Sequence, residues 1–153
     1  LLGAILTNNT HFDKVSDILT VDHFFDPVHA RIFDRCAARI TKSHLVSPVT
    51  LKAEFETDEG LKDLGGPAYL VRMQAASVSA FAIREYAFVI IDMWTRRQLL
   101  QSARETISRL YDGEDFADVR NDVEATLSTL QATNDQVPFR SIASSVEGSD
   151  PSL

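Results

Sequence analysis

The feature that most constrains this chain is a long helical pattern, a tight turn and a second helical pattern within residues 79–132. The first helix is predicted to run from Ala80 to Tyr111, which at 1.5 Å per residue is roughly 45 Å. The pair Asp112-Gly113 predicts its end, because glycine readily adopts the left-handed conformation that follows a helix. Asp115 predicts the start of the second helix, since its carboxylate can accept N–H groups of the first turn. We therefore expect an antiparallel helical hairpin.

The two predicted helices differ in how their apolar residues are spaced. The second carries one apolar stripe at spacings of three and four, formed by Phe116, Val119, Val123, Leu127 and Leu130. The first has consecutive apolar residues at Phe88–Ile91, which cover the whole circumference of a turn. A helix that is apolar all round must be buried on more than one side. The hairpin is thus expected to pack on its own chain and on another copy. The predicted interface residues are Tyr86, Val89, Ile90, Met93, Trp94, Val123 and Leu127.

The composition is that of a globular protein without internal disulfides or membrane-spanning segments. The 153 residues are 44% hydrophobic, enough to bury a core. Cys36 is the only cysteine, so an internal disulfide is impossible, which fits a reducing cytoplasm. No apolar run approaches the roughly 20 residues of a membrane span. The chain begins Leu-Leu-Gly without Met, and we expect it to be a piece of a longer polypeptide.

Helical patterns also dominate the rest of the chain. Asp26-Pro27 and Ser47-Pro48 predict helix starts, since each places a capping side chain before a proline at the first helical position. No segment alternates as a strand would. The predicted helical segments before the hairpin are Leu1–Leu6, Phe12–Leu19, Pro27–Ile40, Val49–Phe55 and a short helix from Pro67. The fold class is therefore all-α: a small helical bundle over 1–78, a protruding antiparallel hairpin over 79–132, and a linker or tail over 133–153.

The search for catalytic or ligand-binding chemistry finds no convergent set. Gly60 and Gly65 match the glycine spacing of a phosphate-binding loop, but Gly66-Pro67 follow where Lys and Ser/Thr are needed, so we interpret a loop between helices. Cys36 lies among apolar residues and is interpreted as a buried hydrophobe rather than a nucleophile. The histidines lack metal-site spacing and are assigned helix-end and surface roles, although a metal site stays open as an alternative. They are His11, His23, His29 and His44.

Charge argues against a general nucleic-acid platform. The formal net charge is −7, whereas nucleic-acid affinity depends on Lys and Arg that neutralise phosphates. Four arginines make a modest basic stripe on the first hairpin helix, at Arg96, Arg97, Arg104 and Arg109. We interpret them as a solvated face paired with nearby acids, with contact to DNA or to an acidic protein as the alternative.

Several short motifs occur in an order and spacing that resemble a known family. They are LLGAIL at the start, HFFDPVHARIF (23–33), SPVTL (47–51), LGGPAYL (64–70) and REYAFVIIDMWTRRQLL (84–100). Together, over about residues 1–132, they resemble the N-terminal domain of bacterial replicative DNA helicases of the DnaB type. The segment PFRSIASSVEGSD after the hairpin resembles the linker to the helicase's motor domain.

The resemblance implies a non-catalytic collar domain of a hexameric, ATP-driven helicase that unwinds DNA at the replication fork. The domains would form a trimer of dimers joined through the hairpin and would dock the C-terminal domain of primase. No cofactor is expected in this chain, because ATP and magnesium would bind only the absent motor domain. DNA contact by this domain would be weak or absent. The sequence supplies the candidate primase-binding residues, which are Tyr69, Leu100, Tyr111 and Phe116.

Two other classes remain as alternatives to this assignment. One is a generic helical dimerisation or scaffold module, for which the hairpin argument would hold and the primase would not. The other is a small helical enzyme, which the lack of an acid, base, nucleophile or metal set argues against. A phosphate-binding loop encoded downstream of Leu153 would separate the helicase from both.

Overall fold

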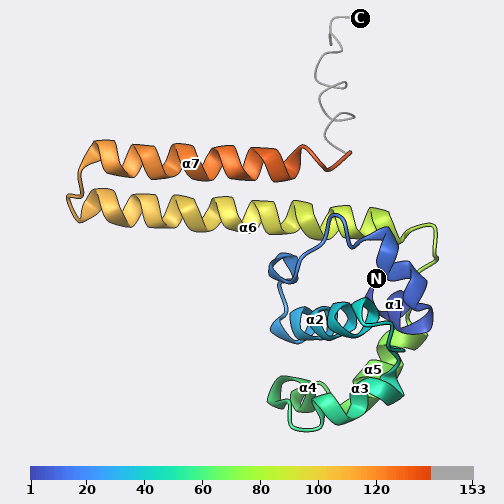
Figure 1. Ribbon diagram of the computed structural model, residues 1–153. Coiled ribbons are helices and arrows are strands. Elements are labelled where there is room, and N and C mark those ends of the chain that lie inside the picture. The colour runs from blue at the N-terminus through green and yellow to red at the C-terminus, as the bar shows by residue number, and fades with distance from the viewer. Residues whose placement is uncertain (139–153) are drawn as a thin grey trace, which may run out of the picture. The chain divides into compact units, whose positions relative to one another are not determined.

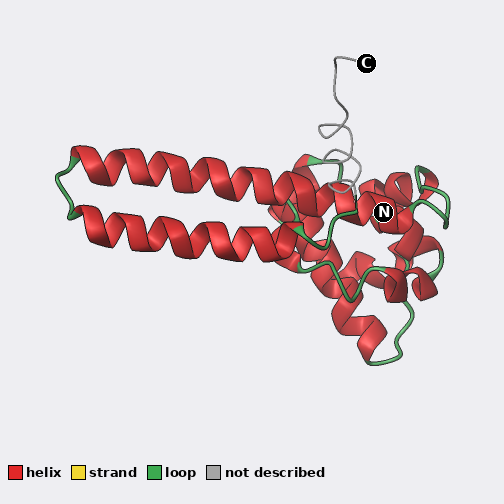
Figure 2. Ribbon diagram, turned by 90° about the horizontal axis from the view of Figure 1, so that it is seen from above, coloured by secondary structure: helices red, strands yellow, loops and turns green. Residues whose placement is uncertain are grey.

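The computed structural model describes residues 1–138, and within that range the protein is helical almost throughout. No strand occurs among these residues, which confirms the all-α prediction (Figure 2). The predicted tail from Phe139 on lies outside the described residues, so its role as a linker stays a prediction. The chain divides into two compact units inside one helix, the first being Leu1–Ile90 and the second beginning at Ile91.

The first unit is a bundle of short helices (Figure 1). In it α1 contacts α5, α2 and η1, while α3 and α4 both contact α5. Its elements are α1 (Leu2–Thr7), the 3-10 helices η1 (Asn9–Lys14) and η2 (Val21–His23), α2 (Pro27–Thr41), α3 (Pro48–Phe55), α4 (Glu59–Asp63), α5 (Pro67–Ala75) and the first turns of α6 (Ile83–Tyr111).

The helix starts follow from local side-chain chemistry, as the sequence predicts. The Asp26 carboxylate accepts the backbone N–H of Val28 before α2. Ser47 forms a capping box with Thr50 before α3, and Asp58 accepts the N–H of Leu61 at the start of α4. Each cap satisfies N–H groups that have no partner within the helix.

Close packing of α1 on α5 depends on a glycine. A Cβ added at Gly3 would lie 1.9 Å from the backbone oxygen of Met73 in α5, far inside van der Waals contact. The residues of α1 from Leu2 to Leu6 are all buried. This close approach of the two helices allows Ile5 and Leu6 to enter the core, where they are at most 2% exposed.

Two predictions of local structure in the first unit are wrong. The segment Phe12–Leu19 is not one helix: η1 ends at Lys14 and turns follow, with Val15 and Leu19 buried. Asn8 initiates η1 because its side chain accepts the N–H of Thr10. The segment after Asp58 is a short helix, α4, rather than a loop, since the Asp58 cap outweighs the poor helix propensity of Gly60.

The start of α6 is fixed to the first unit by apolar burial and by an ion pair. Ile83 and Ala87 are fully buried. The Arg84 guanidinium donates two hydrogen bonds to the Asp17 carboxylate, at 2.9 and 3.0 Å, and a third to the backbone oxygen of Lys14. The helix begins at Ile83, three residues after the predicted start at Ala80. The Phe81 ring that precedes it is 98% exposed.

The second unit is the hairpin proper. Here the rest of α6 and α7 (Phe116–Asn134) lie side by side and antiparallel, joined by a short turn (Figures 1 and 2). No helix in the described part of the chain is both long and apolar enough to cross a membrane.

Candidate protein interface on the helical hairpin

The turn of the hairpin is built as the sequence predicts. Gly113 has a φ of 78°, a conformation that glycine adopts without strain, and a Cβ there would meet nothing within 4 Å. The Asp115 carboxylate accepts the N–H of Ala117 and starts α7. Two aromatic side chains flank this turn in the open: Tyr111 is 89% exposed and Phe116 is 69% exposed. The tip therefore presents two rings to solvent.

Arg109 ties the two helices together just below the tip. Its Nε donates to Glu114 at 2.7 Å, and its Nη2 lies 2.9 Å from the Asp122 carboxylate of α7. The guanidinium lowers the pKa of Glu114 below its ordinary value, and the two carboxylates raise the pKa of Arg109. These groups face water, so the cluster fixes the geometry of the turn more than it stabilises the fold.

The hairpin buries little apolar surface of its own. Among residues 91–138 the buried apolar side chains are Ile91, Val119, Leu130 and Val137. Twice as many large apolar side chains are exposed in the same range: Met93, Leu99, Leu100, Ile107, Leu110, Tyr111, Phe116 and Leu127. A surface with this balance is typical of a segment that another molecule covers.

Several half-buried positions of α6 in this unit carry small polar side chains instead of apolar ones. The hydroxyls of Thr95 and Thr106 donate to carbonyls of their own helix, at 2.9 and 2.7 Å. Such side chains contribute little hydrophobic free energy. Some larger apolar residues of α6 in this unit, such as Leu100 and Ile107, are more than half exposed instead.

The predicted interface residues are thus partly exposed and partly enclosed in the single chain. Tyr86, Val89, Met93 and Leu127 are each about half exposed, at 46–51%. Ile90, Trp94 and Val123 are intermediate in burial. The apolar run Phe88–Ile91 divides accordingly: Phe88 and Ile91 point inward, whereas Val89 stays open.

The candidate primase-binding residues are divided between the two units. Tyr111, Phe116 and Leu100 are exposed in the second unit. Tyr69 belongs to α5 in the first unit, where its hydroxyl lies 2.7 Å from Nε2 of His29 on α2. The two rings are nearly coplanar, 7° apart, with centroids at 6.1 Å, so the contact is an edge-on hydrogen bond rather than face-to-face stacking. Tyr69 is therefore half-buried and links α5 to α2 through this hydrogen bond.

Residues considered for metal or nucleotide chemistry have structural partners. His11 donates from Nδ1 to the backbone oxygen of Ala4, and His23 accepts the N–H of Thr20. Within residues 1–138 no group of three or more His, Cys, Asp or Glu side chains could hold a metal. Gly60 lies inside α4, while Gly65 and Gly66 end that helix with positive φ angles of 105° and 67°. Cys36 is fully buried, and burial raises the pKa of its thiol to about 12.

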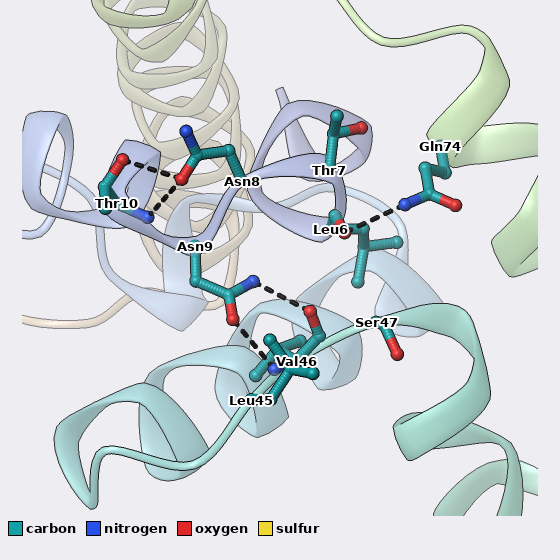
Figure 3. Close-up of a pocket in the computed structure, with 9 residues that line it drawn as sticks. All are labelled: Leu6, Thr7, Asn8, Asn9, Thr10, Leu45, Val46, Ser47 and Gln74. Carbon is teal, nitrogen blue, oxygen red and sulfur yellow. Dashed lines mark hydrogen bonds between the residues drawn. The ribbon is translucent and has the colours of Figure 1, made fainter.

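An open hollow of about 470 Å³ lies between the end of α1 and the loop before α3 (Figure 3). Its polar side chains are already engaged. Asn9 donates to the backbone oxygens of Ile5 and Val46 and accepts the N–H of Val46, all within 2.9 Å. Gln74 donates to the backbone oxygen of Leu6 at 3.0 Å. The Asn9 hydrogen bonds thus hold the 45–47 loop next to the end of α1. The polar side chains that line the hollow do not converge on a ligand.

Sequence reasoning missed two kinds of residue in these regions. Asn9 and the Arg84–Asp17 pair act through partners far along the chain, which local patterns do not reveal. Ile107 and Leu110 were not assigned to an interface, although each is about half exposed. Their spacing from Leu100, at seven and ten residues, is the signal that could have identified them.

Comparison with known families decides the identity of the domain. Residues 1–92 match the family model described as the DnaB-like helicase N-terminal domain. The chain belongs to this family. This match confirms the resemblance seen in the sequence.

The relatives are whole helicases of which this DnaB-type domain covers a part. It is 32% identical to the replicative DNA helicase DnaB of Rickettsia prowazekii over 73% of this chain and 23% of that protein. It is 28% identical to that of Geobacillus stearothermophilus over 78% of this chain and 26% of that protein. The chain therefore spans about a quarter of the length of these relatives.

A solved structure shares the fold. The N-terminal domain of DnaB helicase from Mycobacterium tuberculosis superposes with a TM-score of 0.73 at 22% identity, covering 83% of this chain and 91% of that one. The similarity establishes a common all-helical architecture for the two domains.

Proposed function

We propose that this chain is the non-catalytic collar domain of a hexameric replicative DNA helicase, and that it assembles the ring and docks primase. The observation that carries the proposal is the hairpin that exposes twice as many large apolar side chains as it buries. Membership of the DnaB-type family supports a helicase context over a generic dimerisation module. The parent protein would unwind DNA in the cytoplasm with an ATPase domain that this chain does not supply.

Assembly is proposed to proceed through dimers that the hairpin joins, three of which make the collar of the full protein. The free energy comes from covering half-exposed side chains such as Val89 and Met93, at about 25 cal/mol per Å². Sedimentation equilibrium of the purified chain tests this directly. We expect a dimer or a larger species at micromolar concentration, and a monomer at the highest accessible concentration would contradict the proposal.

Direct DNA binding by this domain is proposed to be weak. The chain is acidic overall, and at least three of the five arginines on α6 are paired with acids: Arg84 with Asp17 and Arg96 with Asp92, both at 2.9 Å, and Arg109 with Glu114 and Asp122. A net negative charge and paired arginines both weaken the attraction of the domain to phosphates.

The chain alone should not bind ATP. The Gly60–Gly66 segment is a helical turn and its end, so its backbone N–H groups do not converge on a phosphate as those of a nucleotide-binding loop do. Isothermal titration of the purified chain with Mg·ATP should give no saturable heat. Binding at one nucleotide per chain would overturn our interpretation of this segment.

Primase docking is expected to use the two rings at the hairpin tip. Tyr111→Ala and Phe116→Ala should each weaken binding of the cognate primase C-terminal domain by about thirtyfold, the effect of losing roughly 2 kcal/mol at an aromatic anchor. The test is calorimetric titration of wild type and variants, with circular dichroism to confirm folding.

Val49 offers a matched control for this titration. Its side chain is 82% exposed on α3, which belongs to the first unit, whereas the tip belongs to the second, so Val49→Ala should bind primase as wild type does. Unchanged affinity in both tip variants would remove the site assignment. No binding by folded wild type would favour the generic dimerisation module.

A further inference from the structure

The hollow next to α1 has exposed apolar side chains beside it. Leu45, which lines the hollow, is 68% exposed (Figure 3). Val71 is 56% exposed and precedes Gln74, another lining residue, by three positions on α5. Residues three apart on a helix are surface neighbours, so Val71 lies next to Gln74 on the α5 side of the hollow. We call the hollow together with Leu45 and Val71 the bundle recess, and all of it belongs to the first unit.

The exposed leucine of the bundle recess is carried by a fixed backbone. The Asn9 side chain bonds both the N–H and the carbonyl oxygen of Val46, the residue that follows Leu45, at 2.9 and 2.8 Å. Ser47 is then held by its capping box with Thr50. An apolar side chain on a fixed backbone loses little conformational freedom when a partner covers it, which favours binding. The recess is therefore preorganised to receive an apolar side chain.

The bundle recess is formed by segments that carry positive charge without acidic residues. They contain the exposed side chains of Lys42, Lys52 and Arg72, and within residues 1–138 none of these three forms an ion pair. A local excess of cations on a chain with a net charge of −7 favours a partner that brings carboxylates. The segments that supply the recess and contain no Asp or Glu are 1–12, 42–53 and 64–82.

These charges also bear on which molecule can occupy the bundle recess. A second copy that used the same surface would place Lys42 and Lys52 against the same cations, because a two-fold contact is made by the same patch on both copies. Like charges that face each other oppose such a contact. A nucleic-acid strand would leave Leu45 and Val71 unmatched, since its affinity depends on contacts between cations and phosphates. A peptide that carries both carboxylates and apolar side chains matches both features.

We propose that the bundle recess binds an acidic, amphipathic peptide segment of a partner protein. An apolar side chain of the segment contacts Leu45 and Val71, while its carboxylates approach Lys42 and Lys52. The contact is small, and contacts of this size are typical of transient complexes. The recess belongs to the first unit and the hairpin tip to the second, so the inference goes beyond the proposed function and does not depend on it.

A fluorescently labelled synthetic peptide of glutamate and leucine is the probe for this site. Fluorescence anisotropy measures its binding to the purified chain, and circular dichroism confirms that each variant folds. We expect saturable binding that Leu45→Ala weakens by about tenfold, because the variant lacks an apolar anchor. Lys42→Glu should weaken binding by about fivefold, since it sets a carboxylate against an acidic peptide. Added salt should weaken binding to wild type as well.

Two variants and two peptides serve as matched controls. Phe81→Ala removes a larger side chain that is 98% exposed, and Lys62→Glu makes the same charge change on α4. Both variants should bind the peptide as wild type does. A peptide with lysine in place of glutamate, and one with serine in place of leucine, should not bind.

The proposal is overturned if the glutamate–leucine peptide does not bind, or if wild type and Leu45→Ala bind it equally well. Binding of the lysine peptide in place of the acidic one would also overturn it, as would displacement of the acidic peptide by single-stranded DNA. A Leu45→Ala chain that sediments as a smaller species than wild type would make the recess a contact between copies, which again contradicts the proposal.

Discussion

Replacing Val89 with glutamate should convert the assembled chain into folded monomers. Val89 is 47% exposed in the single chain, so a charge there does not disturb the fold of one copy. On pairing, the carboxylate would be buried without a partner, since its neighbours on the helix are the acids Glu85 and Asp92, at a cost of about 3 kcal/mol per copy. A two-fold contact contains this cost twice, so the dimer should weaken by about 10⁴-fold. Sedimentation equilibrium of variant and wild type measures the effect.

Gln98 provides the control for this substitution. It is exposed on α6 and is not one of the predicted interface residues, so Gln98→Glu adds the same charge to the same helix and should leave assembly unchanged. Equal loss of assembly in both variants would point to a general charge effect. A Val89→Glu protein that still sediments as wild type would place the contact elsewhere. Ile90 is a poorer test position, since its intermediate burial would mix folding with assembly.

Gly3→Ala should strongly destabilise the bundle. The new Cβ would lie 1.9 Å from the backbone oxygen of Met73 and 2.8 Å from its carbonyl carbon. These are backbone atoms, so α1 and α5 must separate, which exposes the core around Ile5. We expect a loss of about 3 kcal/mol, the upper end for overpacking, from a total stability on the order of 10 kcal/mol. Urea unfolding followed by circular dichroism measures the free energy of unfolding.

Gly60→Ala is the matched control within another helix. A Cβ at Gly60 would meet the ends of the Arg31 and Val28 side chains, both at 2.8 Å, rather than backbone. The exposed Arg31 side chain can shift, and alanine favours the helix by up to about 1 kcal/mol, which offsets part of the cost of moving the buried, β-branched Val28. The loss of unfolding free energy should therefore be smaller than for Gly3→Ala. If Gly3→Ala is equally mild, the close approach of α1 to α5 does not limit stability.

Local chemistry explains why much of the fold is predictable. The starts of α2, α3 and α7 depend on Asp26, Ser47 and Asp115, whose side chains bond to N–H groups two or three residues away. Such short-range hydrogen bonds can be inferred from a few consecutive residues of the sequence. The end of α6 depends likewise on Gly113, which tolerates its positive φ. The helical hairpin is therefore predictable before any tertiary contact is known.

Contacts between distant segments explain what could not be predicted. The hydroxyl of Tyr69 meets His29, forty positions earlier, so sequence alone left open whether that ring was core or surface. The run Phe88–Ile91 contains residues of two helix faces. The Phe88 side chain is buried in the interior of the chain, whereas the Val89 side chain is exposed. Only the fold separates them. The exposed apolar residues of α6 can be recognised as a set once the inward-facing residues are known.

The central claim is that the hairpin, rather than the bundle, joins copies of this chain. Amide hydrogen exchange at increasing protein concentration tests it most directly. We predict that amides of residues 93–110 in α6 become more protected as the chain assembles, while those of α2 keep the same exchange rates at every concentration. Protection that rises in α2 but not in α6, in protein whose mass increases with concentration, would contradict the account.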